Sequence, residues 1–163
     1  MKITAVEEYG LRCLLRVAEG EEDGEPISAQ SIADREGLSV SYTQKLLRIL
    51  TQGELVESRR GAHGGFVLAR NVDEITLGDA IRVLGGVFDV EEICERHTGE
   101  MKTCAHKCHC TIRPVWSYIS RFVIQTLDAI SLSDLMRDER AVARHLAENV
   151  PAAAAGSNHR GTL

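Results

Sequence analysis

Residues 27–47 of this chain read ISAQSIADREGLSVSYTQKLL, which are two short helical patterns joined by a turn. Ser28 is placed to cap the first helix, and Gly37 ends it. Ser39 is placed to cap the second helix, whose apolar side is formed by Leu46, Leu47 and Leu50. Two short helices with a turn of about three or four residues that contains glycine have the proportions of a helix-turn-helix.

The second helix of this motif leaves polar and basic side chains on the side away from its leucines. In a helix-turn-helix this second helix is the recognition helix, which lies in the major groove of DNA. We expect it to make the groove and phosphate contacts, through Ser41, Tyr42, Gln44, Lys45 and Arg48.

Residues 55–69 continue as strand, glycine-rich turn and strand, with the segments LVESRR, GAHGG and FVLA. The tip of this hairpin carries Arg59, Arg60 and His63. A hairpin after a recognition helix is a wing, whose glycines let backbone approach phosphates while an arginine enters the minor groove. The alternative is a surface hairpin with solvated arginines. The preceding helices favour the wing, so we expect a mainly α chain with a small β-hairpin, a winged helix-turn-helix.

The distribution of charge supports contact with nucleic acid. The net charge is −5, yet residues 41–70 hold five cations and two anions, a local +3 that leaves −8 for the rest. The cations are Lys45, Arg48, Arg59, Arg60 and Arg70. A basic region on an acidic protein is typical of a localised contact with a polyanion.

Further helices flank this module. An amphipathic helix is predicted over Thr4–Glu19, and a helix with a capping box over Thr76–Leu84. A long helix begins near Pro114, and a weaker one covers residues 134–149. The long helix has surplus apolar surface around Trp116, which favours a partner helix from a second copy over a core helix in a monomer.

These patterns divide the chain into four parts. A winged helix-turn-helix domain covers residues 1–86 and a cysteine-rich, cluster-binding loop covers 87–111. A dimerisation helix and the helix after it cover 112–150, and a tail expected to be disordered covers 151–163.

Composition indicates a cytoplasmic protein. Of the 163 residues 44% are hydrophobic and 26% charged, which are ordinary globular values. No apolar run approaches the ~20 residues that cross a bilayer. The start MKITAVEEYG lacks the basic-then-apolar pattern of a secretion signal, so we expect reduced thiols.

Residues 94–110 concentrate the chemistry of the chain, with four of the five cysteines and three of the six histidines. Thiolates bind soft metals and iron–sulphur clusters, and a segment with so little apolar content needs an inorganic centre to order it. Clustered cysteines in a reducing compartment more often indicate a metal than disulphides. The remaining Cys13 lies among apolar residues and is predicted to be a small buried hydrophobe.

Taken together, these segments resemble the IscR/NsrR-type winged-helix transcription regulators. The resemblance includes YGLRCLLRVA, the helix-turn-helix, the wing RRGAHGGF, the phrase EITLGDAIRVLGG, the cysteine loop and the long helix near the tryptophan. It implies a homodimeric repressor or activator, not an enzyme, that binds pseudo-palindromic double-stranded DNA operators. It also implies a [2Fe–2S] or [4Fe–4S] cluster that controls DNA affinity by sensing nitric oxide, oxygen, redox state or iron supply.

Three cysteine ligands follow from the resemblance. Family members typically place five residues between successive cysteines, and the third cysteine stands six residues before the tryptophan. That pattern assigns Cys110 and Cys104 here. Cys94 is then the first ligand, although nine residues separate it from Cys104, and Cys108 is an additional thiol that could substitute.

The fourth ligand divides the family. IscR-like members use a histidine three residues after the last cysteine, but that position is Arg113 here, which stays protonated and cannot ligate iron. NsrR-like members use an aspartate on the first helix of the other subunit, and the matching residue is Glu8. The alternative for Glu8 is an i,i+4 ion pair with Arg12 on a solvated face. His106 and His109 are rival ligands.

Two other functions compete with a cluster sensor. Four cysteines with nearby histidines also suit tetrahedral zinc, which would make the loop a structural metal site in a winged-helix regulator. A thiol redox enzyme using Cys108 or Cys110 is the other candidate, but the sequence offers no paired base and orienting residue.

Overall fold

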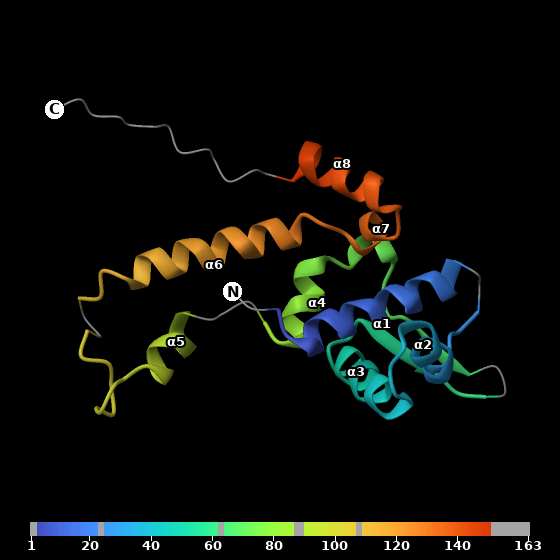
Figure 1. Cartoon of the computed structure of the whole chain (residues 1–163), viewed down its shortest axis with the longest axis horizontal. Coiled ribbons are helices and arrows are strands. Elements are labelled where there is room, and N and C mark those ends of the chain that lie inside the picture. Colours follow the sequence, from blue (N-terminus) through green and yellow to red (C-terminus); the bar gives the residue numbers. More distant parts are fainter. Residues whose placement is uncertain (1–2, 23–24, 62–63, 87–89, 107–108, 151–163) are drawn as a thin grey trace.

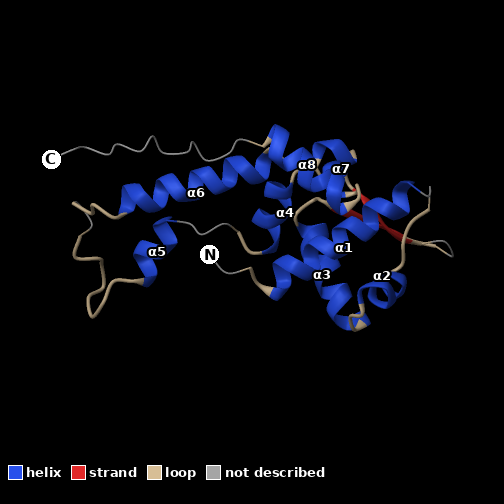
Figure 2. Cartoon of the chain, turned by 45° about the horizontal axis from the view of Figure 1, so that its top comes forward, coloured by secondary structure: helices blue, strands red, loops and turns tan. Residues whose placement is uncertain are grey.

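The computed structural model describes residues 3–22, 25–61, 64–86, 90–106 and 109–150. Helices α1 to α4 and a β-hairpin form one compact unit, from which α6 extends toward α5 (Figure 1). The elements are α1 (Ala5–Glu22), α2 (Ala29–Glu36), α3 (Val40–Gln52), β1 (Val56–Arg59), β2 (Gly65–Leu68), the short 3-10 helix η1 (Val72–Glu74), α4 (Leu77–Leu84), α5 (Val90–Arg96), α6 (Arg113–Asp128), α7 (Leu132–Leu135) and α8 (Glu139–Asn149). The hairpin and α5 lie at opposite ends of the molecule (Figure 2).

The helix-turn-helix forms as the sequence predicts. The Ser28 hydroxyl accepts a hydrogen bond from the Ser31 amide at 3.1 Å, and the Ser39 hydroxyl accepts one from the Tyr42 amide at 3.3 Å. Both serines thereby satisfy an amide that the first turn of a helix leaves without a partner. Gly37 ends α2 with φ of 66°, in the left-handed region that favours glycine.

The core lies between α1, α2 and α3. Its fully buried residues include Cys13, Leu14, Ile32, Leu46 and Leu50. The buried position of Cys13 confirms that this thiol packs as an apolar group. Burial raises the pKa of Cys13 to about 11, so the thiol stays protonated at neutral pH.

The predicted hairpin is a two-stranded antiparallel sheet that packs beside the helix-turn-helix. Val56 lies opposite Leu68, and Arg59 lies opposite Gly65. Ile27, just before α2, joins the sheet through two backbone hydrogen bonds with Phe66, at 3.1 and 2.8 Å. The strand passes so close that a Cβ at Gly65 would lie 2.6 Å from the Ile27 carbonyl oxygen. Only glycine fits there.

Two helix starts are joined in the middle of the fold. Thr76 caps α4 in the predicted capping box with Asp79, and Ser131 caps α7 in a second box with Asp134. Thr76 and Ser131 face each other in an antiparallel bridge, with Leu77 N to Ile130 O at 2.8 Å and Leu132 N to Ile75 O at 2.7 Å. This bridge brings the chain back from α6 to the compact unit.

The region after α6 corrects one prediction. A single helix over residues 134–149 was expected, but α7 ends at Leu135 and α8 begins separately at Glu139. The break occurs because the Asp138 side chain accepts hydrogen bonds from the amides of Arg140 and Ala141, both at 3.0 Å, and starts a new helix.

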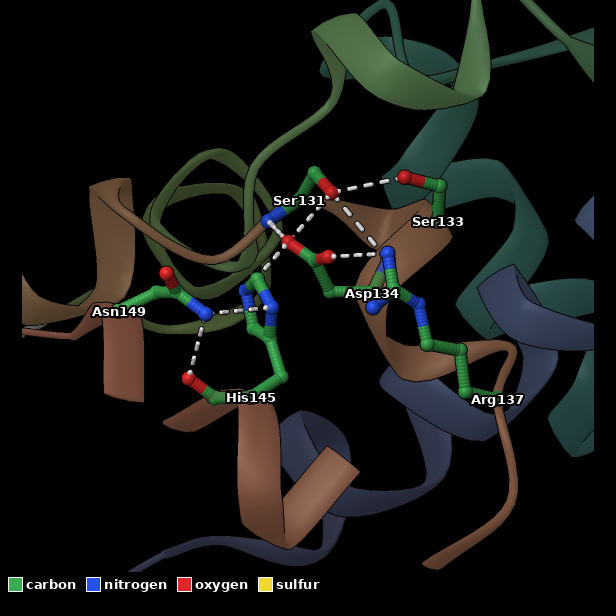
Figure 3. Close-up of polar contacts among 6 residues, drawn as sticks. All are labelled: Ser131, Ser133, Asp134, Arg137, His145 and Asn149. Atoms are coloured by element: carbon green, nitrogen blue, oxygen red, sulfur yellow. Dashed lines mark hydrogen bonds and ion pairs between the residues drawn. The ribbon is translucent and has the colours of Figure 1, made fainter. Parts of the chain in front are cut away.

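A polar network holds α8 on α7 (Figure 3). Asp134 is buried and pairs with Arg137 at 3.2 Å and with His145 at 3.3 Å. The Ser131 hydroxyl donates to the same carboxylate at 2.7 Å. Burial alone would raise the pKa of Asp134, but the bonds from Ser131 and the two basic partners lower it below its ordinary value.

Within the described residues, no helix is both long and apolar enough to cross a membrane.

Candidate DNA-binding surface and cysteine site

The exposed side of α3 is a polar and basic stripe. Ser41, Gln44, Lys45 and Arg48 are exposed and spaced so that they share one helix face. The opposite face is buried through Thr43, Leu46, Leu47 and Leu50. The helix contains no acidic residue, so nothing on α3 itself neutralises its two cations.

Tyr42 lies differently from the other predicted contact residues of α3. It is half-buried, and its ring packs edge-on against Tyr9 of α1 with 6.2 Å between ring centroids. This contact fixes the start of α3 on α1. Tyr42 therefore borders the exposed stripe instead of lying within it.

The wing adds two more exposed cations, Arg59 and Arg60. Neither of them, nor Lys45 or Arg48 on α3, has an ion-pair partner among the residues that the structure describes. Arg70, by contrast, pairs with Asp79 at 3.5 Å. Of the five cations in the basic region, four have no ion-pair partner in the described chain, and the fifth, Arg70, is paired with Asp79. The predicted contact residue His63 lies outside the described residues.

Two of the predicted cysteine ligands line one hollow of about 530 Å³ beside α6. Cys94 reaches it from α5, and Cys104 reaches it from the loop that follows. The rest of the lining is formed by Val90, Glu95, Thr98, Lys102, Thr103 and Arg113. The hollow therefore combines two thiols with two cations, Lys102 and Arg113, and one carboxylate, Glu95.

The third predicted ligand, Cys110, lies next to this hollow. Its sulphur accepts a hydrogen bond from the Arg113 amide at 3.3 Å, at the first turn of α6. No group of three or more His, Cys, Asp or Glu side chains close enough to hold a metal occurs in the described ranges. Cys94 and Cys104 thus line the same hollow, and Cys110 is hydrogen-bonded to Arg113, another residue of its lining, but the described residues form no complete ligand cage.

The other predicted ligands are spread around the loop. His106 and His109 are exposed, and Cys108 lies outside the described residues. Glu8 pairs with Arg12 on α1, accepting hydrogen bonds from Nε at 2.9 Å and from Nη2 at 2.6 Å. Both side chains of this pair are about half exposed, at 46% and 50%. Within this chain Glu8 is therefore engaged in the i,i+4 ion pair.

Comparison with known proteins supplies the family. The Rrf2 family model, described as "Iron-dependent Transcriptional regulator", matches residues 3–138. The chain belongs to the Rrf2 family. Protein rrf2 of Nitratidesulfovibrio vulgaris strain Hildenborough is 36% identical over 139 residues, which are 85% of this chain and 89% of that protein.

Solved structures of Rrf2 relatives share the fold. CymR, the global cysteine regulator of B. subtilis, is 34% identical with a TM-score of 0.66, over 83% of this chain and 96% of CymR. The IscR of T. potens is 31% identical with a TM-score of 0.65, over 83% of this chain and 86% of that one. These neighbours confirm the predicted fold class and the assignment to a family of transcription regulators.

Among the lining residues that the sequence analysis did not place at the cysteine site are two cations, Lys102 and Arg113. Sequence analysis excludes Arg113 as an iron ligand and assigns no role to Lys102. The signal was present in the sequence, because both cations stand within the cysteine segment or directly after it. In this Rrf2 protein they bring positive charge to a hollow that contains two thiols.

Proposed function

We propose that this protein is a homodimeric DNA-binding regulator whose operator affinity depends on an iron–sulphur cluster bound at the cysteine hollow. The observation that carries the cluster proposal is the convergence of Cys94 and Cys104 on one hollow, with Cys110 beside it at the first turn of α6. The acid-free stripe of α3 and the wing carry the DNA-binding proposal.

The DNA contact uses both parts of the winged helix-turn-helix. The stripe of α3 enters the major groove, where Gln44 and Ser41 can face base edges. Lys45, Arg48, Arg59 and Arg60 contact phosphates, because each is exposed and none is held by an acid in the described chain.

The second copy packs on the first half of α6. Apolar side chains follow one another there at helical spacing and remain exposed by 37–59%: Ile112, Val115, Trp116 and Ile119. Exposed apolar groups gathered in this way favour a protein interface over contact with water. A symmetric pair of helices would place two copies of α3 for successive major grooves, ~34 Å apart.

The donor set of the hollow fits a cluster. Cys94, Cys104 and Cys110 would supply three thiolates, and Glu8 of the other subunit the fourth ligand, with Cys108, His106 and His109 as alternates. The bound cluster would supply a centre that nitric oxide, oxygen, redox change or iron shortage alters. Ligation would hold α5 and the start of α6 together, and loss of the cluster would release them.

A structural zinc ion is the second candidate. The same observation supports it, because two thiols that share a hollow also suit tetrahedral zinc. Zinc would order the same segment without changing its own oxidation state, since the ion has no accessible second one. The two candidates therefore differ in colour and in sulphide content.

The test is a visible absorption spectrum of anaerobically purified protein, with analysis of iron, sulphide and zinc. Cys104→Ala is expected to abolish the absorbance, and Glu8→Ala to make it labile in air. Cys13→Ala is the matched control, because Cys13 is buried in the core and its loss is expected to leave the absorbance unchanged. A colourless wild-type protein with stoichiometric zinc and no sulphide would exclude the cluster and leave the zinc candidate.

A further inference from the structure

Helix α4 lies between α6 and the helix-turn-helix (Figure 1). It packs on α6 on one side and on α3 and α1 on the other. Within the described chain α3 and α6 do not pack on each other to a comparable extent. Any displacement of α6 therefore reaches α3 mainly through α4.

The contact between α4 and α3 is made by Val83 and Gly53. A Cβ added at Gly53 would lie inside van der Waals contact of both methyl carbons of Val83, so the two helices meet without a gap. Gly53 directly follows α3, and its amide donates to the Ile49 carbonyl at 3.0 Å. Val83 therefore packs against the C-terminal end of α3, whereas Tyr42, near the start of α3, packs against Tyr9 of α1.

The contact between α4 and α6 is made by the neighbouring residue, Arg82. Its guanidinium pairs with Asp128 at the end of α6 at 2.8 Å, and with Asp79 of α4 at 3.0 Å. A Cβ at Gly78, one turn earlier on α4, would overlap the Asp128 carboxylate. The end of α6 is thus seated directly on α4.

We infer that Val83 is a positioning residue for DNA binding, which sets the orientation of α3 through Gly53, while Arg82 ties the same segment of α4 to α6. Adjacent residues of one short helix then link the proposed dimerisation helix to the recognition helix. Because packed interfaces transmit displacement instead of absorbing it, a shift of α6 would rotate α3 in the groove. This inference rests on the proposal that α3 binds DNA.

The test adds side-chain volume on one side of the Val83–Gly53 contact and removes it on the other. Gly53→Ala inserts a methyl group against Val83, and Val83→Ala in the same chain removes the methyl groups that it would strike. Gly53 has φ of −86°, so alanine there is not strained by the backbone and only the contact changes. Affinity is measured by fluorescence anisotropy on a DNA duplex selected with wild-type protein from a random library.

Gly53→Ala is expected to weaken binding by about tenfold, since overpacking shifts helices, and the Gly53→Ala/Val83→Ala double variant to recover most of that loss. Gly10→Ala on α1, where an added Cβ would strike Leu84 of α4 equally closely, displaces α4 from its other side. It is expected to weaken DNA binding as well, but Val83→Ala should not restore the affinity, because Val83 is not the residue that Gly10 strikes. Circular dichroism at the assay temperature gives the folded fraction of each variant.

A second pair of variants tests the link if Gly53→Ala does not fold. Arg82→Gln and Val83→Ala are each expected to weaken binding by about threefold, and their combination to weaken it by less than the product. Arg137→Gln, which breaks an ion pair on α7 instead, is the control. The inference is overturned if Arg82→Gln and Val83→Ala each bind DNA with wild-type affinity. It is also overturned if the Gly53→Ala/Val83→Ala double variant binds DNA as weakly as Gly53→Ala. A wild-type protein that selects no duplex overturns the proposed DNA binding as well.

Discussion

Replacing both wing arginines, Arg59 and Arg60, by glutamine is expected to reduce the salt dependence of DNA binding. Each phosphate contact contributes ~0.9 to the slope of log affinity against log salt concentration, so two contacts contribute ~1.8 per subunit. Between about 50 and about 200 mM salt this slope corresponds to a factor of about 12 for each subunit, or about 150 for the proposed homodimer. The affinity of the wild type should therefore exceed that of the variant most at low salt, and the ratio of the two affinities should fall about 150-fold over this range.

Arg70→Gln is the matched control for this experiment. It removes the same charge from the same basic stretch, but the Arg70 side chain is held by Asp79 at 3.5 Å. We expect its salt slope to stay close to that of the wild type, whereas Arg59→Gln alone lowers the slope by ~0.9 per subunit, or ~1.8 for the homodimer. Anisotropy titrations on one selected duplex at four salt concentrations measure each slope. Equal slopes for Arg70→Gln and Arg59→Gln would refute the assignment of the wing cations.

Three further predictions concern the fold. Ser39→Ala removes the cap of α3 and should destabilise the protein by ~1 kcal/mol in chemical denaturation, whereas Ser39→Asp should be nearly neutral. The pKa of Asp134 is lowered in the folded state, so its stabilisation is complete above the unfolded-state value of ~3.9 and is lost as pH falls through the folded value. Denaturation at a series of pH values should show this loss in the wild type and not in Asp134→Asn. In cluster-free protein, Cys13, with a pKa of about 11 and no exposed surface, should resist iodoacetamide at pH ~8 while Cys94 and Cys104 react, and equal labelling by mass spectrometry would contradict the burial.

The parts of the fold that sequence predicts well are those decided within a few residues. Ser28, Ser39 and Thr76 were predicted as caps and are caps, because a capping side chain bonds an amide two or three residues further on. The hairpin is predicted equally well from the sequence, since its glycine turn and strand residues are contiguous. The folds of the solved Rrf2 structures agree with these local signals.

The features that escaped prediction depend on residues far apart in the chain. Nothing near Arg70 in sequence indicates that Asp79 neutralises it, so a count of charges overstates the basic surface. The antiparallel bridge between Thr76 and Ser131 joins residues far apart in the chain, so no local pattern reveals it. The ligand set remains a prediction, because thiols take their final geometry from the metal that they bind.

The bridge between Thr76 and Ser131 also has an evolutionary consequence. It joins the two ends of the excursion that contains the cysteine segment and α6, so that excursion is a closed loop whose ends meet at the compact unit. Lengthening such a loop costs little free energy, since each doubling of its length adds only ~0.6 kcal/mol of closure entropy. Insertions between α4 and α6 can therefore accumulate without disturbing the helix-turn-helix. The wide spacing between Cys94 and Cys104 is the kind of change that this anchoring tolerates.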